Sequence, residues 1–152
     1  MANLVQITDY LNAKKIKYEV ADLGGEIFTV KEVTKAGIKE DDIVKTLVVH
    51  TNGGFVALAI RGKDRIDFKK VRRLFGSKSE LAKPEEVKKI IGVPVGAVCP
   101  ILIEVPLYLD RKVMSLKHIN MGSGDLTKGL ELELTDLLTI IGKYTIEDLV
   151  LD

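Results

Sequence analysis

Lys45 is a charged residue at the start of an apolar region, where a cation has a chemical or a structural reason to be. The runs 47–49 and 55–60 are rich in β-branched and aromatic residues and are separated by Asn52-Gly53-Gly54, so they predict a buried β-hairpin. Lys45 then lies where a polar segment enters the core. It either keeps its ammonium group in water at the edge of the core or directs a charge into a pocket.

A second candidate is the segment 93–100, VPVGAVCP, which has two prolines and a glycine within an apolar stretch. This composition predicts a shaped loop rather than a helix or strand. Cys99 in this loop could act as a nucleophile together with a histidine. A lone thiol among apolar neighbours is more typical of a small core residue, and we favour that interpretation.

Other catalytic patterns are absent from the sequence, which has no GxSxG, Walker loop, GxGxxG after a strand or HExxH. His50, His118 and Cys99 do not have the spacing of a metal site, which usually needs three or four protein ligands. We therefore expect neither a metal nor a cofactor.

The length of 152 residues predicts one domain, 1–152, with a sizeable core. One cysteine excludes an intrachain disulfide, and the start MANLVQITDY lacks the features of a secretory signal. No apolar run reaches the roughly eighteen residues of a membrane span. These features predict a cytoplasmic protein without a membrane-inserted part.

The elements that must position these residues follow from periodicity and capping signals. An amphipathic helix is expected over the first sixteen or so residues, and a strand near 17–21. Thr29 and Glu32 fit a capping box at the start of a helix that Gly37 ends. This short helix precedes Lys45 and the hairpin.

After the hairpin, Asp67 can cap a helix that ends at Gly76, and Pro84 suits the first turn of another that ends at Gly92. Strands are expected at 101–105, 107–109, 113–116 and 130–134, with a final helix from 135 to 142. Because the order lacks strict βαβ alternation, we predict an α/β mixed fold, a mixed β-barrel or sheet with flanking helices.

The charge balance argues against a general polyanion-binding surface, since 23 Lys and Arg oppose 22 Asp and Glu. Any contact with nucleic acid must therefore be local. The densest basic cluster consists of Lys69, Lys70, Arg72 and Arg73. It is either a contact for a phosphate backbone or a solvated helix face.

Three segments together resemble a known family: IVKTLVV at 43–49, GAVCP at 96–100, which fits a GxxxP loop, and 121–134, which ends in a Leu-Glu-Leu-Glu-Leu strand. Almost the entire chain resembles the YbaK/ProX family, freestanding relatives of the editing domain inserted in bacterial prolyl-tRNA synthetases. The resemblance implies a mixed β-barrel with flanking helices. It also implies hydrolysis of the ester that joins a wrong amino acid, typically cysteine or alanine, to tRNA with the proline acceptor.

The resemblance also implies roles for individual residues. Lys45 would hold the terminal adenosine phosphate or a substrate carbonyl, and the loop Gly96, Ala97, Val98, Cys99 and Pro100 would stabilise the oxyanion through backbone amides. Substrate contacts are expected from Thr46, Gly122, Gly124 and Lys128. The partners would be a mischarged aminoacyl-tRNA, bound through the basic cluster, and an aminoacyl-tRNA synthetase.

The chain departs from the family pattern in two places. Many members have Ser-Pro-Phe where this chain has Cys99-Pro100-Ile101, and a compact Gly-Gly-Arg-Arg-Gly where 122–129 is longer and lacks arginine. Lys128 would supply part of that positive charge, and the shortage of acidic or basic groups beside Lys45 favours a substrate-assisted route. The alternatives are a non-catalytic tRNA- or synthetase-binding module and a pocket for a free amino acid or nucleotide.

Overall fold

The hairpin that contains Lys45 lies in the middle of a five-stranded sheet in the computed structural model, which describes residues 3–152. Strand β2 (Val44–Thr51) pairs antiparallel with β3 (Gly54–Arg61), and Lys45 lies opposite Ile60. The full strand order is β4-β2-β3-β5-β8, and the other three strands are β4 (Glu80–Leu81), β5 (Leu107–Asp110) and β8 (Thr145–Glu147). The β3, β5 and β8 strands run parallel, so the sheet is mixed.

A second, three-stranded antiparallel sheet has the order β1-β7-β6. Its strands are β1 (Glu19–Asp22), β7 (Lys128–Glu133) and β6 (His118–Gly122). A parallel bridge between Ile43 and Asn120 brings the start of β2 beside β6. The described strands thus form two adjoining sheets, and the predicted barrel is only a loose description of them.

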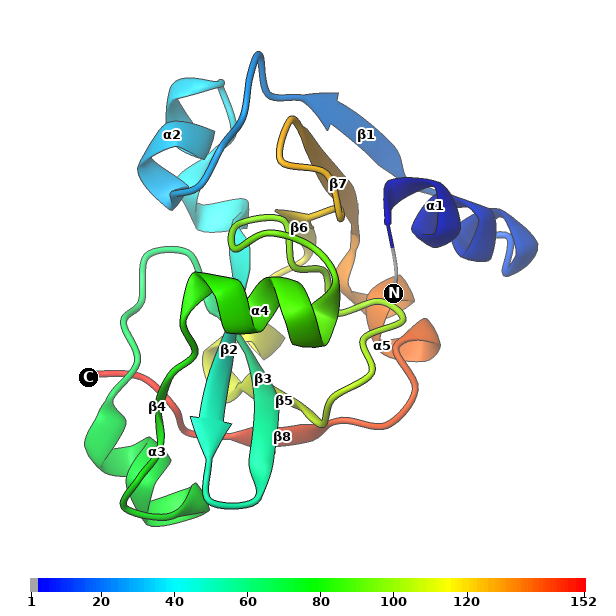
Figure 1. Cartoon of the computed structure of the whole chain (residues 1–152). Coiled ribbons are helices and arrows are strands. Elements are labelled where there is room, and N and C mark those ends of the chain that lie inside the picture. The colour runs from blue at the N-terminus through cyan, green and yellow to red at the C-terminus, as the bar shows by residue number, and fades with distance from the viewer. Residues whose placement is uncertain (1–2) are drawn as a thin grey trace.

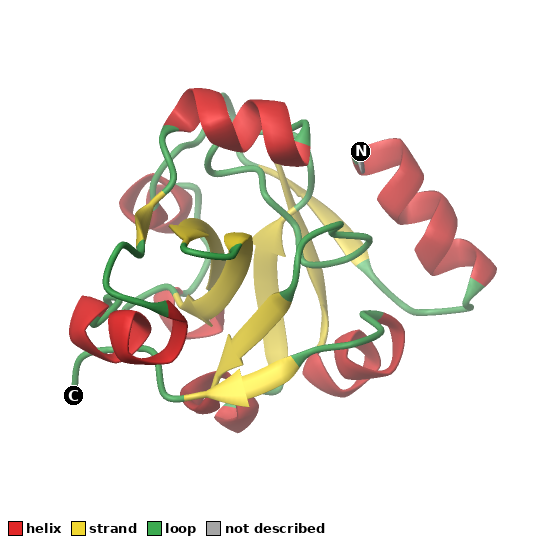
Figure 2. Ribbon diagram, turned by 60° about the horizontal axis from the view of Figure 1, so that its bottom comes forward, coloured by secondary structure: helices red, strands yellow, loops and turns green. Residues whose placement is uncertain are grey.

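The helices lie around the outside of the strands, as Figures 1 and 2 show. They are α1 (Leu4–Ala13), α2 (Val30–Lys35), α3 (Phe68–Phe75), α4 (Pro84–Ile91) and α5 (Leu134–Ile140), together with the 3₁₀ helices Glu40–Asp42 and Arg111–Ser115. The mixed α/β fold with flanking helices is therefore as predicted. None of the described helices is long and apolar enough to cross a membrane.

The predicted helix starts agree with the structure because capping is a local interaction. The Thr29 hydroxyl accepts a hydrogen bond from the Glu32 amide at 3.2 Å, and the Asp67 carboxylate accepts one from the Lys69 amide at 2.9 Å. Pro84 occupies the first turn of α4, where a missing amide proton costs nothing.

Two predicted strands are wrong. Residues 101–105 form turns: proline precedes and follows the segment, and Leu102 has a φ of 62°, so the chain bends away from extended geometry. Residues 113–116 belong mainly to the second 3₁₀ helix, where the Asp110 carboxylate accepts a hydrogen bond from the Lys112 amide at 2.9 Å. This carboxylate caps the turn and starts a helix where the apolar pattern suggested a strand.

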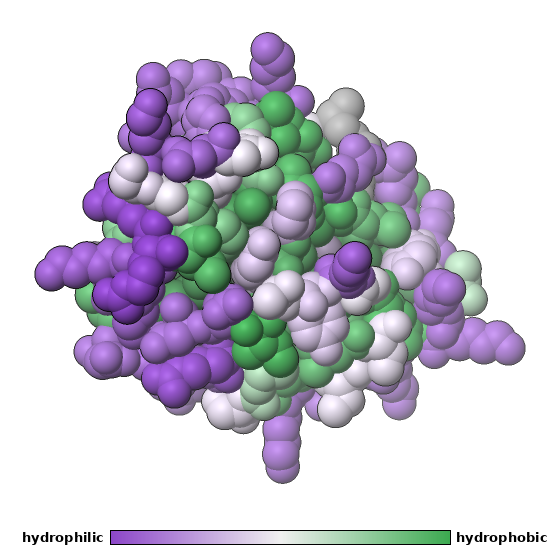
Figure 3. Space-filling model, turned by 90° about the horizontal axis from the view of Figure 1, so that it is seen from below, coloured by the Kyte–Doolittle hydropathy of each residue, from purple (hydrophilic) through white to green (hydrophobic). Residues whose placement is uncertain are grey.

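The apolar core fills the space between the sheets and the helices. Residues 57–60 of β3 are fully buried, and the alternating apolar side chains of β6 and β7, among them Ile119 and Leu130, are buried beside them. Seen from below in Figure 3, hydrophilic side chains gather on the side where α3 lies, with apolar areas between them. The buried side chains of β3, β6 and β7 therefore form a packed core that can support a pocket.

Candidate functional site

A pocket of about 300 Å³ lies where four segments of the chain meet. These segments are the connection from β1 to α2, the start of β2, the loop before Pro100, and the β6–β7 hairpin. Its lining comes from residues within 23–33, 43–47, 95–98, 120–122 and 126–129. The volume is at the lower end of the range for small-molecule sites, so the pocket suits the end of a chain or a single small molecule.

Two glycines let the backbones around the pocket approach each other. Gly96 has a φ of 95°, and a Cβ there would lie 3.0 Å from the carbonyl oxygen of Ile27. A Cβ on Gly122 would clash with the carbonyl oxygen of Val98. The loop is also tied to the hairpin by a hydrogen bond from the Gly124 amide to the Ala97 carbonyl, at 2.7 Å. Glycine is needed where backbone meets backbone in this way.

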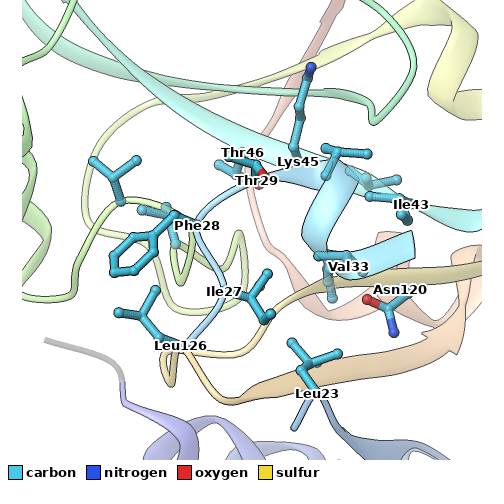
Figure 4. A pocket seen from close by; sticks show the side chains of 18 of the residues that line it. Leu23, Ile27, Phe28, Thr29, Val33, Ile43, Lys45, Thr46, Asn120 and Leu126 are labelled. Atoms are coloured by element: carbon cyan, nitrogen blue, oxygen red, sulfur yellow. The ribbon is translucent and has the colours of Figure 1, made fainter. Parts of the chain in front are cut away.

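Lys45 lines the pocket from β2 and is half-buried. Figure 4 shows its ammonium group directed away from Leu23 and Asn120, which lie at the other end of the pocket. Burial lowers the pKa of Lys45 below its ordinary value of 10.5, and the nearby Asp64 carboxylate partly offsets this effect. The stem of Lys45 is therefore part of the wall, and its charge lies at the rim.

Thr46 and Asn120 are buried polar residues in this lining, with 8% and 3% of their surface exposed. Within the described residues, neither the Thr46 hydroxyl oxygen nor the Asn120 side-chain nitrogen has a hydrogen-bond partner. Buried polar atoms are rarely left unpaired without a reason such as binding. Sequence reasoning missed Asn120, although its position between the apolar Ile119 and Met121 in a strand was an available signal.

Lys128 also lines the pocket and is less available than the sequence suggests. Its ammonium group forms an ion pair with the Asp22 carboxylate at 3.3 Å. The pKa of Asp22 is lowered by the hydrogen bond from the Gly24 amide and then by Lys128. This pair joins β1 to β7 at the edge of the pocket.

Gly96 and Val98 of the GxxxP loop line the pocket, whereas Ala97, Cys99 and Pro100 lie outside the lining. Cys99 is buried and faces a separate small cavity with Val93 and Ile101. Burial raises the pKa of its thiol to about 12, so the thiol stays protonated at neutral pH and is a poor nucleophile. Ala97 and Pro100 are also buried, and they shape the loop rather than line the pocket.

The family model of the aminoacyl-tRNA editing domain matches residues 25–140. Of the described residues that line the pocket, Leu23 alone lies outside this range. The chain belongs to the aminoacyl-tRNA editing domain family. The resemblance to YbaK/ProX proteins and to the editing domain of prolyl-tRNA synthetases is therefore confirmed.

Similar sequences include the proline–tRNA ligases of two Caldicellulosiruptor species. The ligase of Caldicellulosiruptor bescii is 34% identical over 97 residues, which are 62% of this chain and 17% of the ligase. That of Caldicellulosiruptor saccharolyticus is 29% identical over 114 residues, 74% of this chain and 20% of the ligase. The chain thus spans about a fifth of the length of these curated relatives.

Two crystal structures match nearly the whole editing domain. One is a hypothetical protein with a TM-score of 0.83 and 28% identity, covering 95% of this chain and 99% of that one. The other is a candidate trans-editing enzyme for prolyl-tRNA synthetase, with a TM-score of 0.82 and 27% identity, covering 98% and 97% of the two chains.

The basic cluster on α3 of the editing domain is divided by its contacts. Lys70 forms ion pairs with Asp148 at 3.0 Å and Asp152 at 3.3 Å and donates to the Val150 carbonyl at 2.7 Å. Arg72 donates from Nε to the Ser79 carbonyl at 3.1 Å. Lys69 and Arg73 are exposed on the same helix. They are the better candidates for contact with a tRNA backbone, since the other two are engaged within the protein.

Metal-ligating side chains do not cluster in the part of the editing domain that the structure describes. Among residues 3–152, no group of three or more His, Cys, Asp or Glu side chains is arranged to hold a metal ion. The described pocket lining contains none of these four residue types, and its titratable side chains are Lys45 and Lys128.

Proposed function

We propose that this editing domain is a trans-editing aminoacyl-tRNA deacylase. It hydrolyses the ester of a mischarged tRNA, Cys- or Ala-tRNA with the proline acceptor, and acts in the cytoplasm as a single domain, residues 1–152. An aminoacyl-tRNA synthetase is a second partner. The observation that carries the proposal is the position of Lys45 in a small pocket that also contains the Gly96 and Val98 backbone. The similarity to a candidate trans-editing enzyme supports it.

In this mechanism the loop stabilises the negative charge that forms on the ester oxygen. Hydrolysis of the ester forms a tetrahedral intermediate with an oxyanion, which backbone amides in a rigid loop can stabilise. The Ala97 amide already donates to the Pro94 carbonyl at 3.0 Å, so we assign this role to the amides of Gly96 and Val98. Ala97, Cys99 and Pro100 then act by holding the loop in shape.

Lys45 binds the anionic end of the substrate in this scheme. Its half-buried stem packs in the wall, and its ammonium group at the rim meets the terminal adenosine phosphate or the ester carbonyl. Thr46 contacts the substrate beside it. Gly122 lines the pocket beside the loop, and Gly124, outside the lining, braces the loop through its hydrogen bond to the Ala97 carbonyl. Lys128 adds positive charge at the far edge.

Activation of water falls to the substrate, because the described lining has no carboxylate, imidazole or thiol. A tRNA hydroxyl or the substrate side chain accepts the proton of the attacking water while a proton passes to the leaving ribose oxygen. The ester C–O bond then breaks, and the ribose oxygen leaves with a proton. The products are the free amino acid and uncharged tRNA.

The test is release of labelled amino acid from Ala-, Cys-, Ser- and Pro-tRNA with the proline acceptor, using wild type and Lys45→Ala. We expect selective release by wild type and a loss of about 100-fold or more in the variant, the size seen when an oxyanion-stabilising or substrate-orienting group is removed. Lys89→Ala, an exposed lysine on α4, is the matched control and should keep full activity. Undiminished hydrolysis by folded Lys45→Ala would remove this mechanism.

A second candidate is a non-catalytic tRNA- or synthetase-binding module. It is favoured by Cys99-Pro100-Ile101 in the loop and by the lack of arginine in 122–129, which both differ from many family members. Tight binding of tRNA without release of any of the four amino acids would select this function over the deacylase.

A further inference from the structure

Asn120 places an amide group in an otherwise apolar part of the pocket. Its neighbours on β6, Ile119 and Met121, are 0% and 2% exposed, and Asn120 itself is 3% exposed. Its side-chain nitrogen has no hydrogen-bond partner within the described residues. A buried N–H group without a partner costs free energy, so the fold keeps this donor at a cost that a bound acceptor would offset.

Apolar side chains lie around this amide, and the backbone of Gly129 lies against it. Figure 4 shows Asn120 on the side of the pocket where Leu23, Val33 and Ile43 lie. Because Asn120 pairs with Ile43 across the β2–β6 bridge, Thr46 is three residues further along β2, about 10 Å away at the usual rise per residue. The amide is therefore well separated from Lys45 and Thr46, and the charge of Lys128 on the neighbouring strand β7 is paired with Asp22.

The distance from Asn120 to the loop suits an aminoacyl group. Asn120 and Gly122 are two residues apart on β6, so they share one face of the strand and are separated by about 7 Å. Gly122 lies directly against the Val98 carbonyl. An ester carbonyl bound by the loop amides would thus place a short side chain within reach of the Asn120 amide.

The direction of entry places the amino acid, rather than the adenosine, at this end. The aminoacyl group is the last group on the tRNA chain, and the phosphates that precede it must stay near solvent. Phe28 is 50% exposed and Asn120 is 3% exposed, so the pocket is more open at Phe28 than at Asn120. The buried end at Asn120 is where the end of the substrate comes to rest.

We infer that Asn120 is a specificity-determining residue that favours aminoacyl groups with a hydroxyl or thiol on the β-carbon over alanine. The inference rests on the proposed function and narrows its substrate. A hydroxyl oxygen accepts a hydrogen bond from the Asn120 nitrogen, and a thiol does so more weakly. The methyl group of alanine leaves the buried donor unpaired, and sites built around such a donor discriminate strongly against substrates that lack the acceptor.

The test measures binding as well as turnover. The ligands are seryl- and alanyl-adenosine analogues in which an amide replaces the ester, and calorimetry gives their dissociation constants for wild type and Asn120→Ala. Hydrolysis of Ser- and Ala-tRNA is measured in parallel, each rate divided by the rate without protein. Thr51→Val is the matched control, because it removes a buried hydroxyl of β2 outside the pocket lining. Asn120→Leu, which keeps more of the volume, replaces Asn120→Ala if that variant does not fold.

We expect wild type to bind the seryl analogue about tenfold or more tightly than the alanyl analogue. Asn120→Ala should bring this ratio close to one, and Thr51→Val should leave it unchanged. Equal affinities in wild type, no binding of either analogue, or an unchanged ratio in folded Asn120→Ala would overturn the inference. Loss of both affinities by the same factor would show a structural role only. Absent hydrolysis with an intact seryl preference would instead overturn the deacylase proposal and leave the role of Asn120 standing.

Discussion

Gly122 lies against the carbonyl oxygen of Val98 so closely that no Cβ fits between them. This contact explains why β6 can support the loop that carries the proposed oxyanion donors. A larger residue would push Val98 and Gly96 away from the positions that a bound carbonyl needs. The absence of a side chain at Gly122 is therefore needed for the proposed oxyanion donors, Gly96 and Val98, to keep their positions.

Gly122→Ala should lower both stability and activity. The added methyl group overlaps a backbone atom that cannot rotate away, so we expect a loss of about 1–3 kcal/mol in the free energy of unfolding. Deacylation should fall about tenfold or more as the loop shifts. Urea unfolding and amino-acid release measure the two effects.

The control for this substitution is Gly53→Ala in the β2–β3 turn. A Cβ there lies 4.0 Å from the nearest side-chain atom, that of Thr51, which is ordinary contact. Its stability should stay within about 0.5 kcal/mol of wild type, with full activity. If Gly122→Ala matched Gly53→Ala in both measurements, the contact between Gly122 and the Val98 carbonyl would matter for neither stability nor activity.

The β6–β7 hairpin is the element that supports the buried end of the pocket, and a histidine joins its two strands. His118 lies between Glu133, at 3.2 Å from Nδ1, and Glu131, at 3.1 Å from Nε2. His118, Asn120 and Gly122 alternate along β6 and so share one face. The ion pairs hold the end of the hairpin opposite to Gly122.

The pKa of His118 is raised above 6.5 by its hydrogen bond to Glu131 and then by that to Glu133. Since the folded pKa exceeds the unfolded value, the protonated form stabilises the fold. This contribution is complete below about pH 6.5 and is lost as pH rises through the folded pKa. It amounts to at most about 1 kcal/mol, because the imidazole is 44% exposed.

His118→Gln should therefore destabilise the protein more at pH 5.5 than at pH 8.5. Urea unfolding of wild type and variant at both values measures the difference, with the glutamates ionised in each case. A stability difference of the same size at both pH values would show that the charge of His118 does not stabilise the hairpin.

At the scale of the whole molecule, a net charge of +1 leaves tRNA binding to local clusters. The ion pairs of Lys70 with Asp148 and Asp152 attach α3 to the C-terminal segment, so this lysine serves the fold. Lys69 and Arg73 remain as the proposed phosphate contacts of α3.

Reversing both charges, Lys69→Glu with Arg73→Glu, should weaken tRNA binding and lower the slope of log affinity against log salt by about one to two. Filter binding at several salt concentrations gives this slope. The control is Lys14→Glu with Lys17→Glu, which changes the net charge equally near α1, on the opposite side of the molecule in Figure 1. Equal changes of slope in the two double variants would exclude α3 as the tRNA contact.

The sequence alone determined the features that depend on neighbours along the chain. The caps at Thr29, Asp67 and Pro84 and the hairpin that starts near Lys45 could be predicted, because a cap or a tight turn is complete within a few residues. The family could also be predicted from the order and spacing of Lys45 and the Gly96–Pro100 loop.

Only the tertiary structure decided which of the candidate residues share a pocket. It brought Asn120 beside Ile43, turned Cys99 toward a separate cavity, and paired Lys70 with the C-terminal segment. The contacts of Asn120 with Ile43 and of Lys70 with Asp148 join residues far apart in the chain, and a polar or charged side chain has no preferred partner until packing supplies one.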